Sequence, residues 1–88
     1  MRKIDIYPKA VRFLAIIPEK HKRQITSKIY QLAENPRPHD SKKLAGFIHF
    51  SASCGEYRII YKFTEALIQV VIIGKRNDDE VYKQLTRH

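Results

Sequence analysis

Hydrophobic positions follow a helical spacing in the first third of the chain. One set recurs at i, i+3, i+4 and i+7, as on one face of a helix: Ala10, Phe13, Leu14 and Ile17. Pro18 ends this helix and can begin a second one, roughly residues 19–34, whose buried stripe is Ile25, Ile29 and Leu32. The other faces of the second helix carry Lys20, Lys22, Arg23 and Lys28. The pattern predicts a helical hairpin with one basic side.

Alternating patterns on both sides of this hairpin predict strands. A short strand at residues 2–7 ends at Pro8. A loop rich in turn formers occupies residues 35–41. Beyond it the period changes to two, which predicts three strands joined by short connections, at 47–53, 57–63 and 67–75. The tail at 78–85 is compatible with a last helical turn or two, with Asp78 as its cap.

This order of elements predicts an α+β fold. We expect an N-terminal strand, a two-helix hairpin packed on one face of an antiparallel sheet, a three-strand meander and a short C-terminal helical tail. A chain of 88 residues suits one domain, so we assign residues 1–88 to a single unit.

Charge and composition narrow the kinds of partner. Seventeen Lys and Arg oppose nine Asp and Glu, a net charge of +8, which favours a polyanionic partner. An acidic protein would use the same field, and a solvated basic surface without a ligand is the simplest alternative. No apolar run has the roughly 20 residues of a membrane span, and no signal-peptide core follows the N-terminus, so a cytoplasmic location is expected. With Cys54 as the single cysteine, we expect neither a disulfide nor a metal or other cofactor.

Alternation divides the strand at 57–63 between two faces. Tyr57, Ile59, Tyr61 and Phe63 share one face, and the other carries Glu56, Arg58, Ile60 and Lys62. An arginine in mid-strand beside an isoleucine is costly unless it meets an anion. Arg58 therefore either binds an anionic ligand or forms a structural ion pair with Glu56 or Glu65.

A second cationic group follows the most apolar strand. Gly74 allows close approach of the backbone, and Lys75 and Arg76 come directly after it. Such a strand end can bind a phosphate, with arginine bidentate and lysine as a point charge, or it is simply solvated. Tyr82, six residues after Arg76, can stack on a nucleobase or donate a proton, or it packs a C-terminal helix onto the sheet.

One histidine is a candidate general base. His49 alternates with Ser51 and Ser53 on the strand before Arg58. A hairpin register in which His49 faces Arg58 across the open side of the sheet would bring the two together. A lone strand histidine is otherwise a structural or surface residue. The sequence has no glycine-rich phosphate loop, paired-carboxylate constellation or nucleophile–histidine signature.

The order and spacing of four segments resemble the RelE/ParE toxin superfamily. The segments are LAENPRP at 32–38, KLAG at 43–46, GEYRIIY at 55–61 and GKRNDDEVY at 74–82. The similarity runs from the first strand to the tail, and the last segment is similar to the RelE branch in particular. In that branch the strand-end arginine and the tyrosine six residues later belong to the active site.

The resemblance implies the toxin of a type II toxin–antitoxin system. Such a toxin is a ribosome-dependent endoribonuclease (mRNA interferase) that cuts messenger RNA, inhibits translation and is held inactive in an oligomer with its cognate antitoxin. The implied chemistry is metal-free attack of a ribose 2′-oxygen on the adjacent phosphate. Arg58 would stabilise the phosphate, Arg76 would do likewise or assist the leaving group, and Tyr82 would orient the substrate. We expect further contacts with RNA from Lys43, Lys62 and Lys75.

One departure from the family pattern bears on the acid and base. RelE-type enzymes often carry lysines on the strand before the Tyr-Arg strand, where this chain has His49, Ser51 and Ser53. Cationic help to proton transfer is then weaker, or His49 takes the role of base.

Two other functions fit the same sequence. A ParE-like toxin would bind DNA gyrase without nuclease chemistry and would not need Arg76 and Tyr82 in this arrangement. A non-catalytic module would only bind an antitoxin or nucleic acid through its basic surface. In each case an antitoxin has two surfaces available, the basic faces of the helical hairpin and the open edges of the sheet.

Overall fold

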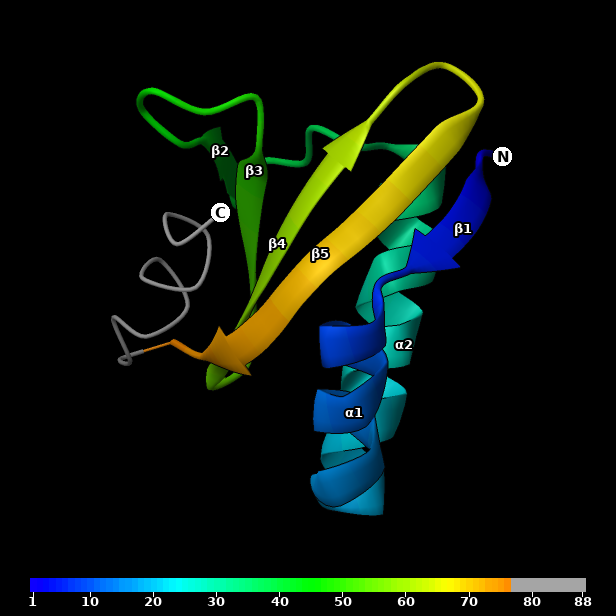
Figure 1. Ribbon diagram of the computed structural model, residues 1–88, viewed down its shortest axis with the longest axis vertical. Coiled ribbons are helices and arrows are strands. Elements are labelled where there is room, and N and C mark those ends of the chain that lie inside the picture. Colours follow the sequence, from blue (N-terminus) through cyan, green and yellow to red (C-terminus); the bar gives the residue numbers. More distant parts are fainter. Residues whose placement is uncertain (77–88) are drawn as a thin grey trace.

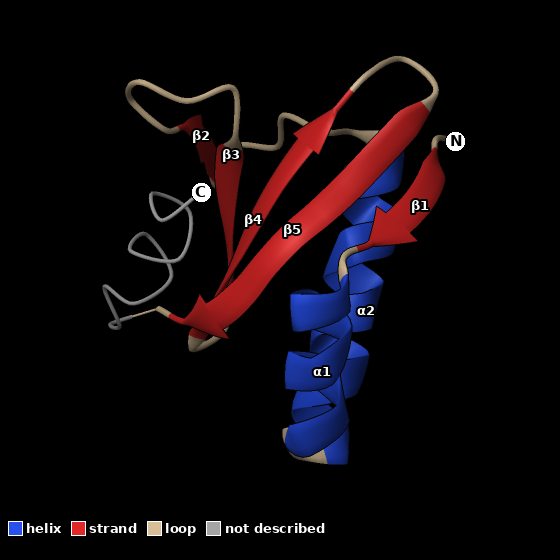
Figure 2. Cartoon of the chain, in the orientation of Figure 1, coloured by secondary structure: helices blue, strands red, loops and turns tan. Residues whose placement is uncertain are grey.

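The computed structural model describes residues 1–76, which form a five-stranded sheet with two helices on one face (Figures 1 and 2). In chain order the elements are β1 Lys3–Ile6, α1 Pro8–Ile16, α2 Glu19–Glu34, β2 Ser41–Lys43, β3 Phe50–Cys54, β4 Tyr57–Phe63 and β5 Leu67–Lys75. The strand order is β1-β5-β4-β3-β2, in which β1 is parallel to β5 and every other neighbouring pair is antiparallel. The predicted α+β architecture is confirmed, with one difference: β1 runs parallel to β5, so the sheet is mixed and not antiparallel throughout.

The structure corrects the prediction on the edge side of the sheet. α2, β4 and β5 have the predicted bounds. The strand predicted at 47–53 begins only at Phe50, because the preceding residues turn back from β2. β2 itself was not predicted, since three residues are too few to show an alternating pattern. The helical tail predicted at 78–85 lies outside the described residues.

The two helices form a hairpin because a proline separates them. α1 begins at Pro8, and proline suits the first turn of a helix. Ile17, which precedes Pro18, is extended with φ −91° and ψ 161°, because a residue before proline avoids the helical region. α2 begins at Glu19, whose negative charge is favourable at a helix N-terminus. Neither of these described helices is long and apolar enough to cross a membrane.

The main core lies between the helices and the sheet. It joins the predicted stripe of α2 to buried residues of the three central strands, among them Ile25, Ile29, Leu32, Tyr61 and Val70. Tyr61 is fully buried, and its hydroxyl donates a 2.6 Å hydrogen bond to the carbonyl of Pro36. This bond satisfies a buried polar group and ties the loop after α2 to the centre of the sheet.

A bulge in β5 shifts the alternation of its side chains, so that Val70 and Ile73, three residues apart, both face the helices. Ile60 of β4 pairs with Ile72, whereas the next residue of β4 pairs with Val70. Val71 is therefore an extra residue on β5. Ile73 packs towards the helices, and Ile72 joins Ile60 in a second apolar cluster on the other side. We call this other side, opposite α1 and α2, the open face.

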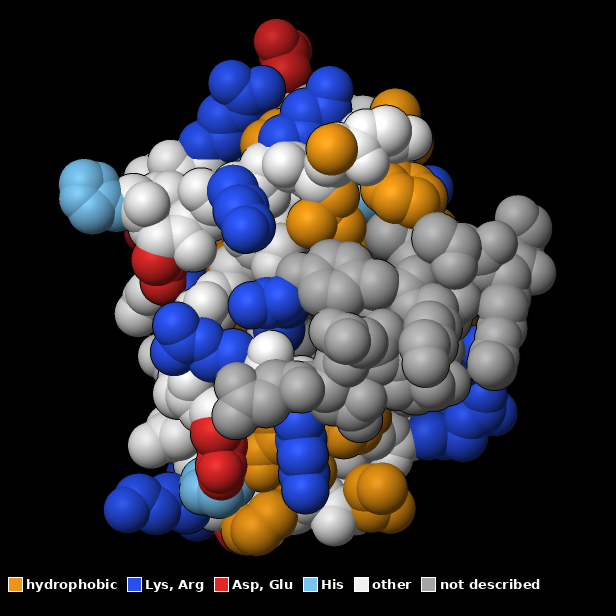
Figure 3. Space-filling model, turned by 90° about the vertical axis from the view of Figure 1, so that its left-hand side faces the viewer, with side chains coloured by type: hydrophobic (Ala, Val, Ile, Leu, Met, Phe, Trp, Pro, Cys, Tyr) orange, Lys and Arg blue, Asp and Glu red, His pale blue; other side chains and the backbone are white. Residues whose placement is uncertain are grey.

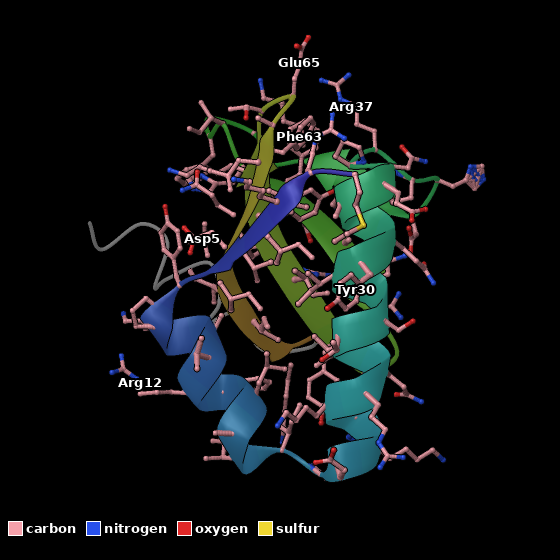
Figure 4. All side chains as sticks on the ribbon, turned by 90° about the vertical axis from the view of Figure 1, so that its right-hand side faces the viewer. Asp5, Arg12, Tyr30, Arg37, Phe63 and Glu65 are labelled. Carbon is pink, nitrogen blue, oxygen red and sulfur yellow. The ribbon has the colours of Figure 1, made fainter. Side chains whose placement is uncertain are left out.

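Structural contacts occupy the end of the sheet beyond β4. Arg2 donates from Nε to the carbonyl of Thr64 at 2.6 Å, and its guanidinium lies 5.5 Å from the centre of the Phe63 ring. Figure 4 shows Phe63, Arg37 and Glu65 near this end of the molecule. These contacts fasten the N-terminus to the β4–β5 turn.

Candidate functional site

A cleft lies at the side of the open face where β3, β4 and β5 meet the loop before β2. Its volume is about 300 Å³, and its lining residues are His39, Asp40, Ser41, Lys42, Ser51, Ser53, Arg58 and Arg76. The two arginines singled out in the sequence thus share one cleft. Figure 3 views the molecule from this side and shows several Lys and Arg side chains gathered there.

Strand pairing brings the two arginines together. Arg58, the second residue of β4, pairs with Ser53 on one side and with Gly74 of β5 on the other. Arg76 follows the end of β5, and its backbone N–H donates to the carbonyl of Glu56 at 2.8 Å. Arg58 is partly buried and Arg76 is exposed, so the cleft offers one fixed and one accessible guanidinium.

One structural alternative for Arg58 is excluded by distance. Glu65 lies in the turn after β4, at the end of that strand far from Arg58 (Figure 4). The five strand residues from Arg58 to the end of β4 span roughly 17 Å, beyond the reach of an ion pair. The carboxylate of Glu56, the other alternative, lies 3.5 Å from Nδ1 of His21.

The edge strand adds a lysine that the sequence did not single out. Lys42 pairs with Ser51, whose buried side chain lines the cleft, and Lys42 lines it as well. Lys43 pairs with Phe50, which packs on the helix side of the sheet, and it is absent from the cleft lining. Only the alternation of β2 distinguishes the two lysines.

His49 does not line the cleft, although it lies near the same edge of the sheet, the one formed by β2. The register that would bring His49 opposite Arg58 is not the one observed, because Ser53 pairs with Arg58. His49 immediately precedes β3, half-buried against the ring of Phe47. Burial and then the positive charge of Lys62 lower the pKa of His49. Its Nδ1 atom is buried and has no hydrogen-bond partner among the described residues.

Two other predicted RNA contacts also lie outside the cleft. Lys62 belongs to the open face but lies towards the far end of β4, where its ammonium is 5.9 Å from the Tyr7 ring centre. Lys75 is exposed and pairs with Tyr57, a core residue of the helix-covered face. Neither lysine lines the cleft.

A single carboxylate stands among the described residues that line the cleft. Asp40 receives a 2.7 Å ion pair from Lys28 of α2. The hydrogen bond from Lys28 is the main cause that lowers the pKa of Asp40. The ion pair offsets the negative charge that Asp40 would otherwise add beside the two arginines. Among residues 1–76, no group of three or more His, Cys, Asp or Glu side chains is placed to hold a metal ion.

Comparison with solved structures shows which fold positions this cleft. RelE in the archaeal RelE–RelB complex of Pyrococcus horikoshii is 25% identical over 86% of this chain and 96% of its own, with a TM-score of 0.74. A mutant of the E. coli toxin RelE in the free state gives a TM-score of 0.81 at 21% identity, over 98% and 95% of the two chains. The chain has the RelE fold. A RelB–RelE antitoxin–toxin complex from Methanococcus jannaschii is similar too, with a TM-score of 0.69 at 18% identity over 91% and 96%. No family model and no curated protein matches the sequence.

The RelE fold gives a structural reason for the segments that resemble this group. LAENPRP contains Pro36, whose carbonyl accepts the hydrogen bond from Tyr61. KLAG ends at Gly46, which has φ +78° in the turn after β2, a conformation that favours glycine. GEYRIIY supplies the β3–β4 turn and the strand that carries Arg58. Tyr82, in the fourth segment, lies outside the described residues.

Proposed function

We propose that this chain is a RelE-type toxin, an endoribonuclease that binds a scissile phosphate of messenger RNA between Arg58 and Arg76. The observation that carries the proposal is the cleft that these arginines share, in a RelE fold with a net charge of +8. Two guanidinium groups can each form paired hydrogen bonds to phosphate oxygens. Lys42 adds a third positive charge to the lining.

The proposed reaction is attack of a ribose 2′-oxygen on the adjacent phosphate without a metal ion. The 2′-hydroxyl loses a proton, negative charge develops on the phosphate oxygens, and the leaving 5′-oxygen gains a proton. Arg58 and Arg76 stabilise the developing charge, because fixed donors in a partly buried site are aimed at the phosphate in advance. Arg76 is also the proposed aid to the leaving group, and Tyr82 the residue that orients the substrate.

His49 is the proposed proton acceptor. Because its pKa is lowered, its imidazole is neutral at neutral pH and can accept a proton. Nδ1 is buried, so the proton would be accepted at Nε2, from a 2′-hydroxyl that extends beyond the cleft lining. An RNA strand that extends from the cleft along the sheet would pass His49 and Lys62, while Lys43 and Lys75 contact its backbone at the margins.

We further propose a cognate antitoxin as the protein partner, and the ribosome with its messenger RNA as the site of action. Several similar solved structures are RelE–RelB complexes. The sequence left two surfaces as candidates for the antitoxin, the basic faces of the helical hairpin and the open edges of the sheet. They meet in one groove of about 500 Å³, which contains Arg23 and Lys28 of α2 beside Ser53 and Cys54. β2 pairs with β3 only as far as Ala52, so an acidic segment of the antitoxin could pair with the free edge beyond it.

Growth arrest and mapped RNA ends test the proposed function. Induction of the wild-type chain should stop growth and produce messenger RNA ends at defined codon positions. Arg58→Ala and Arg76→Ala should each lower the cleavage rate by about 100-fold or more, because each removes a donor to the transition state, while the fold is retained. Arg12→Ala, on the exposed side of α1, is the matched control. Full toxicity of both cleft variants would reject the site, and DNA damage without codon-positioned cuts would favour a gyrase inhibitor.

A further inference from the structure

The turn between β3 and β4 is joined to the strand end that carries Arg76. The carbonyl of Glu56 accepts the backbone N–H of Arg76 at 2.8 Å, which extends the β4–β5 pairing by one residue. Arg76 lies where the chain leaves the sheet, and no strand pairing beyond it is present among residues 1–76. The position of the Glu56 carbonyl therefore sets where the Arg76 side chain begins.

The turn itself is short and has few means of fixing its own position. It consists of Gly55 and Glu56, between the paired residues Cys54 and Tyr57. Gly55 has φ +59° and Glu56 has a negative φ, as in a type II′ turn with glycine in its first central position. Such a turn tilts with the two strands that it connects. Contacts from outside the hairpin are needed to hold its tip.

His21 of α2 supplies those contacts. Its Nδ1 atom is 2.6 Å from the hydroxyl of Tyr57 and 3.5 Å from a carboxylate oxygen of Glu56. Its ring meets the ring of Tyr57 edge to face at 5.3 Å, and Phe13 of α1 meets the same ring at 5.7 Å. One half-buried histidine thus touches both residues that flank the Glu56 carbonyl, from a helix packed on the opposite face to the cleft.

The Tyr57 hydroxyl is a permanent part of this contact. Tyr57 is 5% exposed, and burial, followed by the Glu56 carboxylate, raises the pKa of its phenol. The hydroxyl therefore keeps its proton, so it can donate to Nδ1 when that atom carries no proton and accept from Nδ1 when it does. A buried hydroxyl without that partner would lose its hydrogen bond, so the pair resists displacement of the turn from α2.

We propose that His21 is a positioning residue for Arg76, which acts through Tyr57 and Glu56 to hold the Glu56 carbonyl and, with it, the start of the Arg76 side chain at the cleft. The inference rests on the proposed function only for its effect on RNA cleavage. The chain of contacts from α2 to the backbone of Arg76 stands without it.

Amide-resolved hydrogen exchange of the full chain tests the contact chain directly. His21→Ala should make the Arg76 amide exchange about tenfold faster, because the Glu56 carbonyl is no longer held. His21→Asn should restore most of the protection, since its amide places an acceptor or a donor near the position of Nδ1. Tyr57→Phe, which removes only the hydroxyl, should reproduce the His21→Ala effect even if the alanine variant folds poorly. Tyr30→Ala, on the exposed side of α2, should leave Arg76 unchanged.

Kinetics of RNA cleavage give the functional readout. His21→Ala should lower kcat/KM by about tenfold, as expected when a phosphate-binding group is misplaced, and His21→Asn should recover most of the rate. Unchanged Arg76 exchange in both His21→Ala and Tyr57→Phe would overturn the proposal. If Arg76 exchanges faster in the variants but the wild-type chain does not cleave RNA, the positioning role is upheld and the ribonuclease function is rejected.

Discussion

At the scale of single residues, the cleft depends on which way each side chain leaves its strand. Lys42 and Lys43 are adjacent and equally charged, yet they fall on opposite faces of β2. Arg58 faces the cleft because it alternates with the core residues Tyr57 and Ile59 of β4. Side-chain period, more than residue type, therefore decides which cations can meet one phosphate.

The two neighbouring lysines provide a matched test of that statement. Lys42→Ala should weaken binding of a short RNA that lacks the attacking 2′-hydroxyl and reduce the salt dependence of log K by about one phosphate contact. Lys43→Ala removes the same charge from the other face and should have a clearly smaller effect on both quantities. Fluorescence anisotropy at several salt concentrations measures them. Equal losses in the two variants would show that only the total charge matters.

His49 gives the stability of the protein a dependence on pH. Its pKa is lower in the folded chain than the unfolded value near 6.5, so the unfolded chain binds more protons below about pH 6.5. The free energy of unfolding should therefore decrease as pH falls from 7 to 5, and His49→Gln should flatten this decrease. Asp40 acts only at lower pH, because its pKa is lowered from 3.8. Urea denaturation at pH 5, 6 and 7 measures the effect, and an unchanged slope in His49→Gln would contradict it.

At the scale of elements, loops and short strands are held by contacts from distant residues. The loop after α2 depends on the hydrogen bond from Tyr61 to Pro36, and β2 begins directly beyond that loop. The loop also carries Asp40, whose ion pair with Lys28 ties it to α2. One wall of the cleft is therefore formed by the loop between α2 and β2, which has no regular secondary structure and depends on these contacts.

Removal of one hydroxyl tests how strongly this loop is held. Tyr61→Phe leaves the Pro36 carbonyl without its donor and should lower the free energy of unfolding by about 1–3 kcal/mol. Urea denaturation gives the value. Tyr30→Phe is the control, because Tyr30 is 53% exposed and its hydroxyl can bond to water. A loss in Tyr61→Phe no larger than in the control would mean that the bond contributes nothing to stability.

At the scale of the whole molecule, two sites of different character lie on different sides of β3. The cleft is cationic and open to the face opposite the helices. The groove beside α2 combines Arg23 with the free edge of β3. The two sites adjoin at Ser53, which lines both, so a chain with a net charge of +8 can attract an RNA and an acidic protein segment to neighbouring surfaces.

Charge reversal in the groove tests the second surface. Arg23→Glu should weaken the complex with the cognate antitoxin by about tenfold or more and restore toxicity when the two proteins are expressed together. Arg12→Glu makes the same change on α1, away from the groove, and serves as the control (Figure 4). Calorimetric titration measures the affinities. If both variants bind the antitoxin as tightly as the wild type, the groove is not its docking site.

Elements with a clear hydrophobic period could be predicted from the order of residues. α2, β4 and β5 were located to the residue, because long runs of 3.6 or two-residue spacing reflect burial on one face. The same alternation placed Arg58 opposite the core of β4. Order and spacing of short segments indicated the RelE fold before any contact was known.

Which residues these elements bring together depends on how they pack and could not be predicted. β2 is too short to show a pattern, and Asp40 lies in the loop before it, so the sequence did not predict that Lys42 and Asp40 line the cleft. The hairpin register pairs Ser53, and not His49, with Arg58. The contact of His21 with Tyr57 joins residues 36 positions apart. Such contacts depend on how separate elements pack, and local periodicity contains no information about the distance between them.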